Sequence, residues 1–197
     1  MPPTTICAST TVMDGSLSGR LLVATPLLRD PHFDRTVVMI LEHAPEGAIG
    51  VVLNRPGELD VGAVLPSWGR LGAEPAMVFW GGPVQPDGVI GLFQVADGAE
   101  PPSGWNAVTD RIGVIDLETD PDTIADGVGW LRPFAGYAGW APHQLDAEVA
   151  AQAWWTVDAD PADALTVDPD DLWHRVLGRQ RGRLAWMTNY PDDPALN

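Results

Sequence analysis

Residues 19–56 read GRLLVATPLLRDPHFDRTVVMILEHAPEGAIGVVLNRP, and this stretch decides the fold. It holds three apolar runs, at 21–24, 36–41 and 49–53, which are separated by polar turns containing proline and glycine. Short apolar, β-branched runs bounded by such residues are typical of strands. The stretch 36–43 shows no alternation of apolar and polar residues at its start, which predicts a strand buried on both faces. The turn at 45–48 predicts a tight hairpin into the third run.

The rest of the chain continues mostly as strands. We predict further strands at 76–80, 89–95, 111–117, 131–134 and 154–157, with 89–95 pairing with 76–80 across a turn at 86–88. Helices are predicted at 60–65 with Asp60 as N-cap, at 120–127, at 142–153, and finally from a cap at Asp168 or Asp170 to Gly178. Because the strands follow one another as hairpins, the pattern indicates an α+β fold with mixed or antiparallel sheets and a few peripheral helices. We expect one domain at 19–190 after a disordered leader at 1–18.

Composition limits the classes of function. The 197 residues carry 11 arginines, no lysine and 27 acidic residues, for a net charge of −16. Such a field repels phosphate backbones and anionic membrane surfaces, so direct DNA binding and membrane association are not expected. The single cysteine, Cys7, allows no intrachain disulfide. With no run of some 18 apolar residues and no secretory signal pattern, the sequence predicts a cytoplasmic protein.

Several spaced blocks resemble one family. They are LLVATPLLRDPHFDRTVVMILEH at 21–43, GAIGVVLNRP at 47–56, GGPV at 81–84 and GYAGWAPHQLDAE at 136–148, together with the Leu172–Trp173 pair. These blocks are similar to the AlgH/YqgE family of uncharacterised bacterial proteins. The resemblance implies a single α+β domain of bifurcated, coiled antiparallel sheets. No reaction and no cofactor is established for that family, and some members are described as candidate transcriptional regulators.

One block departs from the family pattern. The usual GWGPGQLE is here GWAPHQLD, so that Ala141, His143 and Asp146 replace two glycines and a glutamate. An imidazole inserted at this helix start would alter any backbone-binding corner there. The departure puts a shared ligand role of this corner in doubt.

The family blocks contain polar groups that are candidates for lining a ligand pocket. These are His43, Asn54, Arg55, Gln144 and Glu148. An arginine fork suits a carboxylate or phosphate. The competing interpretation is structural: the Asn54 amide caps backbone groups, Arg55 pairs internally and His43 is a hydrogen-bonded frame residue. We identify no catalytic residue, metal site or cofactor-binding motif, because the nucleophile and zinc-ligand spacings are missing and the glycines at 81–82 lack the pattern of a phosphate loop.

Two further residue classes bear on partners. Arg175, Arg179, Arg181 and Arg183 form a basic run that could contact DNA, although cations at a helix C-terminus docking on an acidic face explain it as well. Among the nine tryptophans, Trp80, Trp130, Trp140 and Trp155 are predicted to pack the core. Trp68 and Trp105 fall in predicted loops, where they could mark an interaction surface.

The leading functional hypothesis is a non-enzymatic regulatory or interaction module with protein partners. It rests on family blocks without a catalytic constellation. The alternative is a small-molecule-binding domain or cryptic hydrolase with a pocket near His43, Asn54, Arg55 and Gln144. Direct transcriptional control by DNA contact is a third hypothesis, which the net charge disfavours.

Overall fold

The computed structural model describes residues 15–28, 30–124 and 128–187. Its strands are β1 (Arg20–Ala24), β2 (Val37–Ala44), β3 (Gly47–Val52), β4 (Pro56–Asp60), β5 (Met77–Trp80), β6 (Val84–Val95), β7 (Trp105–Ala107), β8 (Ile112–Ile115), β9 (Gly129–Trp140) and β10 (Trp154–Asp158). The helices are α1 (Val61–Val64), α2 (Gln144–Ala150), α3 (Pro161–Ala164), α4 (Leu172–Gly178) and α5 (Arg183–Trp186), with 3₁₀ turns η1 (Pro66–Leu71) and η2 (Pro121–Thr123).

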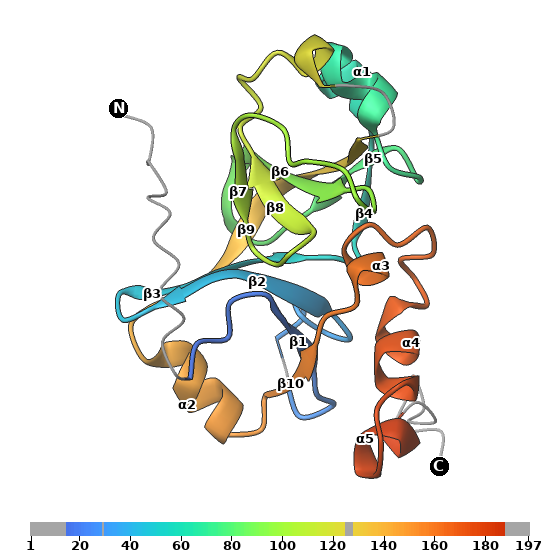
Figure 1. Cartoon of the computed structure of the whole chain (residues 1–197). Coiled ribbons are helices and arrows are strands. Elements are labelled where there is room, and N and C mark those ends of the chain that lie inside the picture. The colour runs from blue at the N-terminus through green and yellow to red at the C-terminus, as the bar shows by residue number, and fades with distance from the viewer. Residues whose placement is uncertain (1–14, 29, 125–127, 188–197) are drawn as a thin grey trace.

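One long strand joins two parts of a coiled sheet. The strand order is β10-β1-β2-β3-β9-β6-β8-β7, and β5 pairs with β4 and β9 beside this path. The C-terminal end of β9 pairs with β3, whereas the rest of β9 pairs with β6. In Figure 1 the sheet of β1, β2, β3 and β10 forms the lower layer, and β6–β9 curl above it. The predicted α+β class and mostly antiparallel pairing are confirmed, since only the β5–β9 pair of strands is parallel among the described residues.

The core follows from the pattern of residues 19–56. Val37, Val38, Met39 and Ile40 on β2 are all fully buried, as predicted for a strand covered on both faces. One face packs under α4 through Met39 and Trp173, and the other packs under α2 through residues such as Leu22 and Leu145. A third cluster fills the upper part around Phe93 and Leu131.

Two predicted details of β5 and β6 are wrong. β5 pairs with β4 and β9 and not with residues 89–95. The predicted turn at 86–88 lies inside the 12-residue β6, where the register against β9 shifts between Val84 and Val89. The proline and glycine there produce an irregularity in one continuous strand and no reversal, because β9 offers an equally long strand to pair with.

Other boundaries also differ from the sequence-based expectation. The strand predicted at 131–134 extends over 129–140, and the helix predicted at 142–153 covers only Gln144–Ala150. The short strands β4 and β7 were not predicted, because the exposed PGELD and the three-residue WNA carry no apolar alternation. Helices α3 and α5 were missed too, and each has only four residues.

Some of the predicted helix starts agree with the structure and others differ from it. Asp60 caps α1 by accepting a hydrogen bond from the Ala63 amide at 3.2 Å, as predicted. The last predicted helix begins after Asp171 and not after Asp168 or Asp170, and α5 follows it. Asp120 caps η2, whereas residues 125–127 of that predicted helix lie outside the described residues.

Most of the predicted leader lies outside the described residues. Of residues 1–18, the structure describes 15–18, and these contact β2. The Leu17 amide donates to His43 Nδ1 at 3.2 Å, and the His43 amide donates to Ser18 Oγ at 2.8 Å. Across the described ranges, every helix is too short to cross a membrane.

Candidate functional site

Asn54 and Arg55 hold the loop before β2. The Asn54 side chain is buried; its Oδ1 accepts from the Val37 amide and its Nδ2 donates to the Arg35 carbonyl, both at 2.9 Å. Arg55 donates from Nη2 to the Asp34 carbonyl. Both side chains therefore use their polar atoms on the residue 34–37 segment of the same chain. This is the structural role that the sequence left open for them.

The other three candidates gather around α2, at what we call the α2 corner (Trp140, Gln144, Glu148 and Trp154). Glu148 Oε2 accepts from the indole Nε1 of Trp140 and of Trp154, each at 2.9 Å, and Oε1 accepts from Gln144 Nε2 at 2.9 Å. The two indoles pack edge to face with centroids 6.2 Å apart. One carboxylate thereby joins α2, β9 and β10. His43 lies beside this corner, with its Nε2 3.8 Å from Asp146 Oδ1.

The substituted family glycine lies at the start of α2. His143 is the N-cap and adopts φ 64°, in the left-handed region, and its side chain makes no capping hydrogen bond. A non-glycine residue in this region is strained, which explains why the family pattern has glycine there. His143 retains the glycine-like backbone without contributing a cap.

The five predicted residues therefore fall in two separate places. Asn54 and Arg55 lie at one end of β3, and His43, Gln144 and Glu148 lie near α2, each with partners inside the chain. None of the five lines either of the two hollows described next. Within residues 15–28, 30–124 and 128–187, no three of the potential metal ligands gather closely enough to hold an ion.

The larger hollow lies between β10 and α5, and we call it the C-terminal groove. Its volume is about 580 Å³, and it is lined by Thr25, Pro26, Leu27, Gln152, Trp155, Leu184, Trp186 and Met187. Its lining carries no ionisable side chain. Leu27 is 69% exposed and Trp186 is 80% exposed. The hollow thus brings together two large apolar side chains that are exposed.

Hydrogen bonds fix one wall of the groove to the sheet. The Thr25 amide donates to the Ala153 carbonyl at 3.1 Å, and Thr25 Oγ1 donates to the Gln152 carbonyl at 2.8 Å. Trp173 on α4 donates from Nε1 to the Ala24 carbonyl at 3.0 Å. Hydrogen bonds within the chain therefore hold the turn at residues 25–27 in place, and no partner protein is needed for this.

A second, smaller hollow of about 320 Å³ lies between residues 64–68 and 117–121. Trp68, predicted as a surface marker, is buried at this place and donates from Nε1 to the Leu117 carbonyl at 3.2 Å. Trp105 is half-buried and packs against the cluster of Phe93 and Leu131. The two tryptophans expected to mark an interaction surface therefore serve the core.

Of the tryptophans predicted to pack the core, Trp130 contradicts the prediction and Trp155 agrees with it. Trp130, predicted to be in the core, is 51% exposed at the start of β9. Trp155 packs partly on the core and also lines the C-terminal groove. The sequence gives no indication of the exposed position of Trp186, because the residues around it show no recognisable motif.

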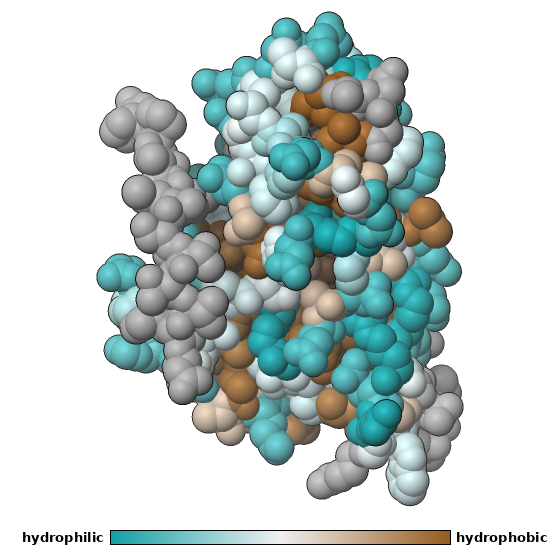
Figure 2. Space-filling model, viewed as in Figure 1, coloured by the Kyte–Doolittle hydropathy of each residue, from teal (hydrophilic) through white to brown (hydrophobic). Residues whose placement is uncertain are grey.

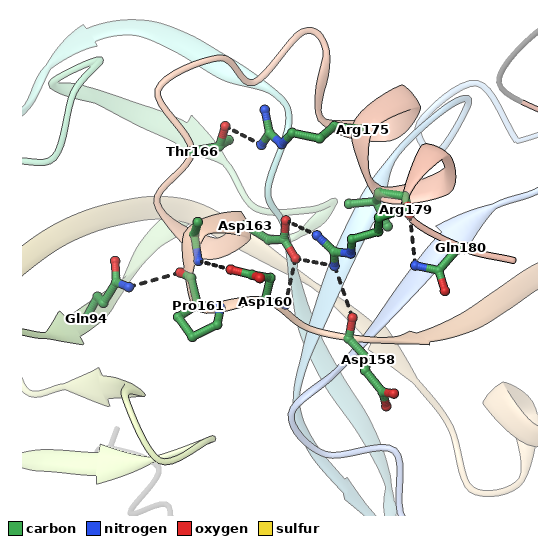
Figure 3. A network of polar contacts seen from close by, with 11 residues as sticks. Gln94, Asp158, Asp160, Pro161, Asp163, Thr166, Arg175, Arg179 and Gln180 are labelled. Carbon is green, nitrogen blue, oxygen red and sulfur yellow. Dashed lines mark hydrogen bonds and ion pairs between the residues drawn. The ribbon is translucent and has the colours of Figure 1, made fainter. Parts of the chain in front are cut away.

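The basic run near the C-terminus is used largely inside the molecule. Arg179 forms a two-pronged ion pair with the buried Asp163, with nitrogen–oxygen distances of 2.7 and 2.5 Å, and donates to the Asp158 carbonyl (Figure 3). The hydrogen bond to Asp163 raises the pKa of Arg179 above its ordinary value. Arg175 donates to Thr166 Oγ1 at 2.6 Å. Arg181 is exposed, and the side chain of Arg183 lies outside the described part.

Another arginine, outside this basic run, ties the C-terminal segment to the upper sheet. Arg132 is fully buried on β9, lies over the ring of Phe79, and donates to the carbonyls of Glu74 and Thr166. Burial lowers the pKa of Arg132 to about 10, and the nearby negative charge of Glu74 offsets only part of this effect. The side chain is a structural connection between segments distant in sequence.

These observations agree with comparisons to known proteins. The family model described as AlgH-like matches residues 21–185. The chain belongs to the AlgH-like family. A UPF0301 protein of Streptomyces coelicolor is 52% identical over 185 residues, covering 92% of this chain and 96% of that protein. The resemblance inferred from the sequence blocks is thus confirmed.

Two solved structures share the fold. The crystal structure of protein DIP2367 from Corynebacterium diphtheriae superimposes with a TM-score of 0.81 at 31% identity, covering 87% of this chain and 91% of that one. The solution structure of the AlgH protein from Pseudomonas aeruginosa gives a TM-score of 0.66 at 26% identity, covering 94% and 100%. Family membership therefore establishes the architecture. It assigns no reaction to the AlgH-like chain.

Proposed function

We propose that this protein is a regulatory interaction module of the cytoplasm that binds a protein segment in the C-terminal groove. The observation that carries the proposal is the exposure of Leu27 and Trp186 at a hollow without ionisable lining. Buried aromatic anchors supply most of the affinity in protein interfaces. In Figure 2 the viewed face is largely hydrophilic over α3 and α4, with hydrophobic residues appearing between α2 and α4. A partner would cover the apolar residues of the groove.

The chemistry of the partner follows from charge. The chain carries a net charge of −16 and the groove itself is uncharged. A partner with apolar anchors flanked by arginine or lysine is therefore attracted over a distance and held by apolar contact. Binding should weaken as salt rises, but moderately, because the anchors are apolar.

Two alternatives have less support. No observation supports a ligand pocket near His43, Asn54, Arg55 and Gln144. The first and last of these lie near α2, the other two lie near the end of β3, and all four are hydrogen-bonded within the chain. Direct DNA contact would rely on arginines of which Arg175 and Arg179 are bound to Thr166 and Asp163. No mobility shift of a DNA fragment is expected at micromolar protein in low salt.

The test is selection of peptides from a displayed library of random 12-residue sequences against the full chain, followed by titration of the best free peptide. We expect net positive peptides with aromatic or aliphatic anchors. Backbone amide NMR signals of residues 25–27, 152–155 and 184–187 should shift most in the titration. Shifts concentrated elsewhere, or selection of no binder that survives competition by free peptide, would contradict the proposal.

A further inference from the structure

We infer that the partner is an extended segment that adds as a strand to the outer edge of β10, with alternate side chains entering the C-terminal groove. The inference rests on the proposed function, which it deepens by naming the conformation of the bound segment. In strand addition, main-chain hydrogen bonds give affinity, and pockets for alternate side chains give specificity.

The hydrogen-bond pattern shows which groups of β10 face outward. The Ala24 amide donates to the Thr36 carbonyl, on the side of β2. The next amide, that of Thr25, donates to the Ala153 carbonyl, on the side of β10. Val23 opposes Trp155 in the antiparallel pair of β1 and β10. The main-chain N–H and C=O groups of successive residues point to opposite sides of a strand. The main-chain groups of Trp155 and Val157 therefore point toward β1, and those of Trp154, Thr156 and Asp158 point to the other side.

Part of this outer edge is already occupied. The Asp158 carbonyl accepts from Arg179 Nη2 at 3.0 Å. β10 pairs with β1 alone among the strands that the structure describes, and the outward N–H and C=O groups of Thr156 have no backbone partner within the described residues. Trp154 is only 3% exposed, so its outward groups are largely covered. Thr156 therefore offers its N–H and C=O groups to an added strand.

The other sheet edges are protected in ways that β10 is not. β4 begins with Pro56, carries Glu58 and Asp60, and shifts register against β5. β7 has only three residues. Proline, charge, irregular register and shortness are the usual devices against strand addition. β10 pairs over five consecutive residues without a shift, has no proline, and carries its one charge at its end, Asp158.

The groove lies on the face of β10 where alternate side chains of an added strand would point. Trp155 belongs to β10 and lines the groove together with Leu184, Trp186 and Met187 of the α5 region. A neighbouring strand places every second side chain on the same face as Trp155. The free edge and the apolar hollow are thus two halves of one extended binding site.

The test uses the full chain and the tightest free peptide of the 12-residue selection. On binding, hydrogen exchange of the Thr156 amide should slow at least tenfold, while that of the Glu58 amide on the edge strand β4 stays unchanged. N-methylation of single peptide amides should weaken binding at least tenfold at every second position within the bound stretch. Thr156→Pro should weaken binding as strongly and leave the fold intact, because proline is tolerated where the N–H faces away from the ladder.

The contrary results separate the two proposals. A peptide that maps to the groove but has no period-two sensitivity, and leaves Thr156 exchange unchanged, binds in another conformation; this overturns the inference and leaves the proposed function intact. Slow exchange at Thr156 in the free full chain would show that the chain's own residues pair with the edge, which also overturns the inference. A peptide that maps away from the groove overturns the proposed function itself.

Discussion

The α2 corner and the C-terminal groove both include a tryptophan from the start of β10, Trp154 and Trp155 respectively, and they differ in how their polar and apolar groups are used. At the α2 corner, the Glu148 carboxylate accepts hydrogen bonds from the side-chain amide of Gln144 and from two indoles. At the groove, tryptophan and leucine side chains face solvent, and Thr156 on the neighbouring strand edge has no backbone partner for its outward groups in the part of the chain that the structure describes. Polar residues that suggest chemistry in the sequence can thus be structural, whereas the exposed apolar surface is where we propose that a partner binds.

The largest expected effect is loss of stability at the α2 corner. Glu148→Ala leaves the indole N–H groups of Trp140 and Trp154 without their acceptor, and should lower the free energy of unfolding by about 3 kcal/mol. Urea denaturation measures it. Asp146→Ala, on the exposed side of the same helix, is the matched control and should change stability by less than about 0.5 kcal/mol. Equal effects of the two substitutions would remove the structural role assigned to Glu148.

A smaller effect is expected at the groove, and on binding instead of stability. Leu27→Ala should lower the affinity for the selected peptide about fivefold, because a partly exposed leucine contributes about 1 kcal/mol when a partner covers it. Calorimetric titration gives the affinity. Val167→Ala, at a residue that is 76% exposed but outside the groove lining, should leave the affinity within twofold. If both variants bind alike, Leu27 lies outside the interface.

The smallest effect concerns the backbone at the start of α2. His143→Gly should raise the free energy of unfolding by about 0.5–1 kcal/mol, because glycine adopts φ 64° without the strain that histidine bears. Thermal unfolding with matched urea data measures the gain. Peptide affinity should stay unchanged, since His143 lies outside the lining of the C-terminal groove and outside β10. A loss of stability would mean that the His143 side chain contributes a contact beyond its backbone role.

The sequence predicts the frame of the fold better than its edges. The buried strand at 36–43, the hairpin that follows it and the Asp60 cap depend on local patterns, and the structure has all three. The partner of β5 and the continuity of β6 depend on β9, which lies some 40 residues further along the chain, and no local signal specifies that pairing. The strand β4 carries no apolar pattern, because it is an exposed edge.

The candidate site could not be predicted in the same way. Asn54 and Arg55 are polar residues within family blocks, but they bond to the segment before β2, which is 17 to 21 residues away. Glu148 bonds to Trp154 only six residues away, but the two meet because the chain turns between α2 and β10. The groove depends on where α5 packs relative to β10, and exposure of Trp186 has no signature in residues 184–187. A helix of four residues leaves no periodic pattern from which its exposed face could be read.

The measurement that tests the central claim most directly compares two exposed tryptophans. Trp186→Ala removes the groove tryptophan, and Trp130→Ala removes one that is 51% exposed in the upper sheet. Titrating both variants with the selected peptide should show at least a tenfold loss of affinity for Trp186→Ala and less than a twofold change for Trp130→Ala. Equal affinities of the two variants would contradict the assignment of the C-terminal groove as the binding site.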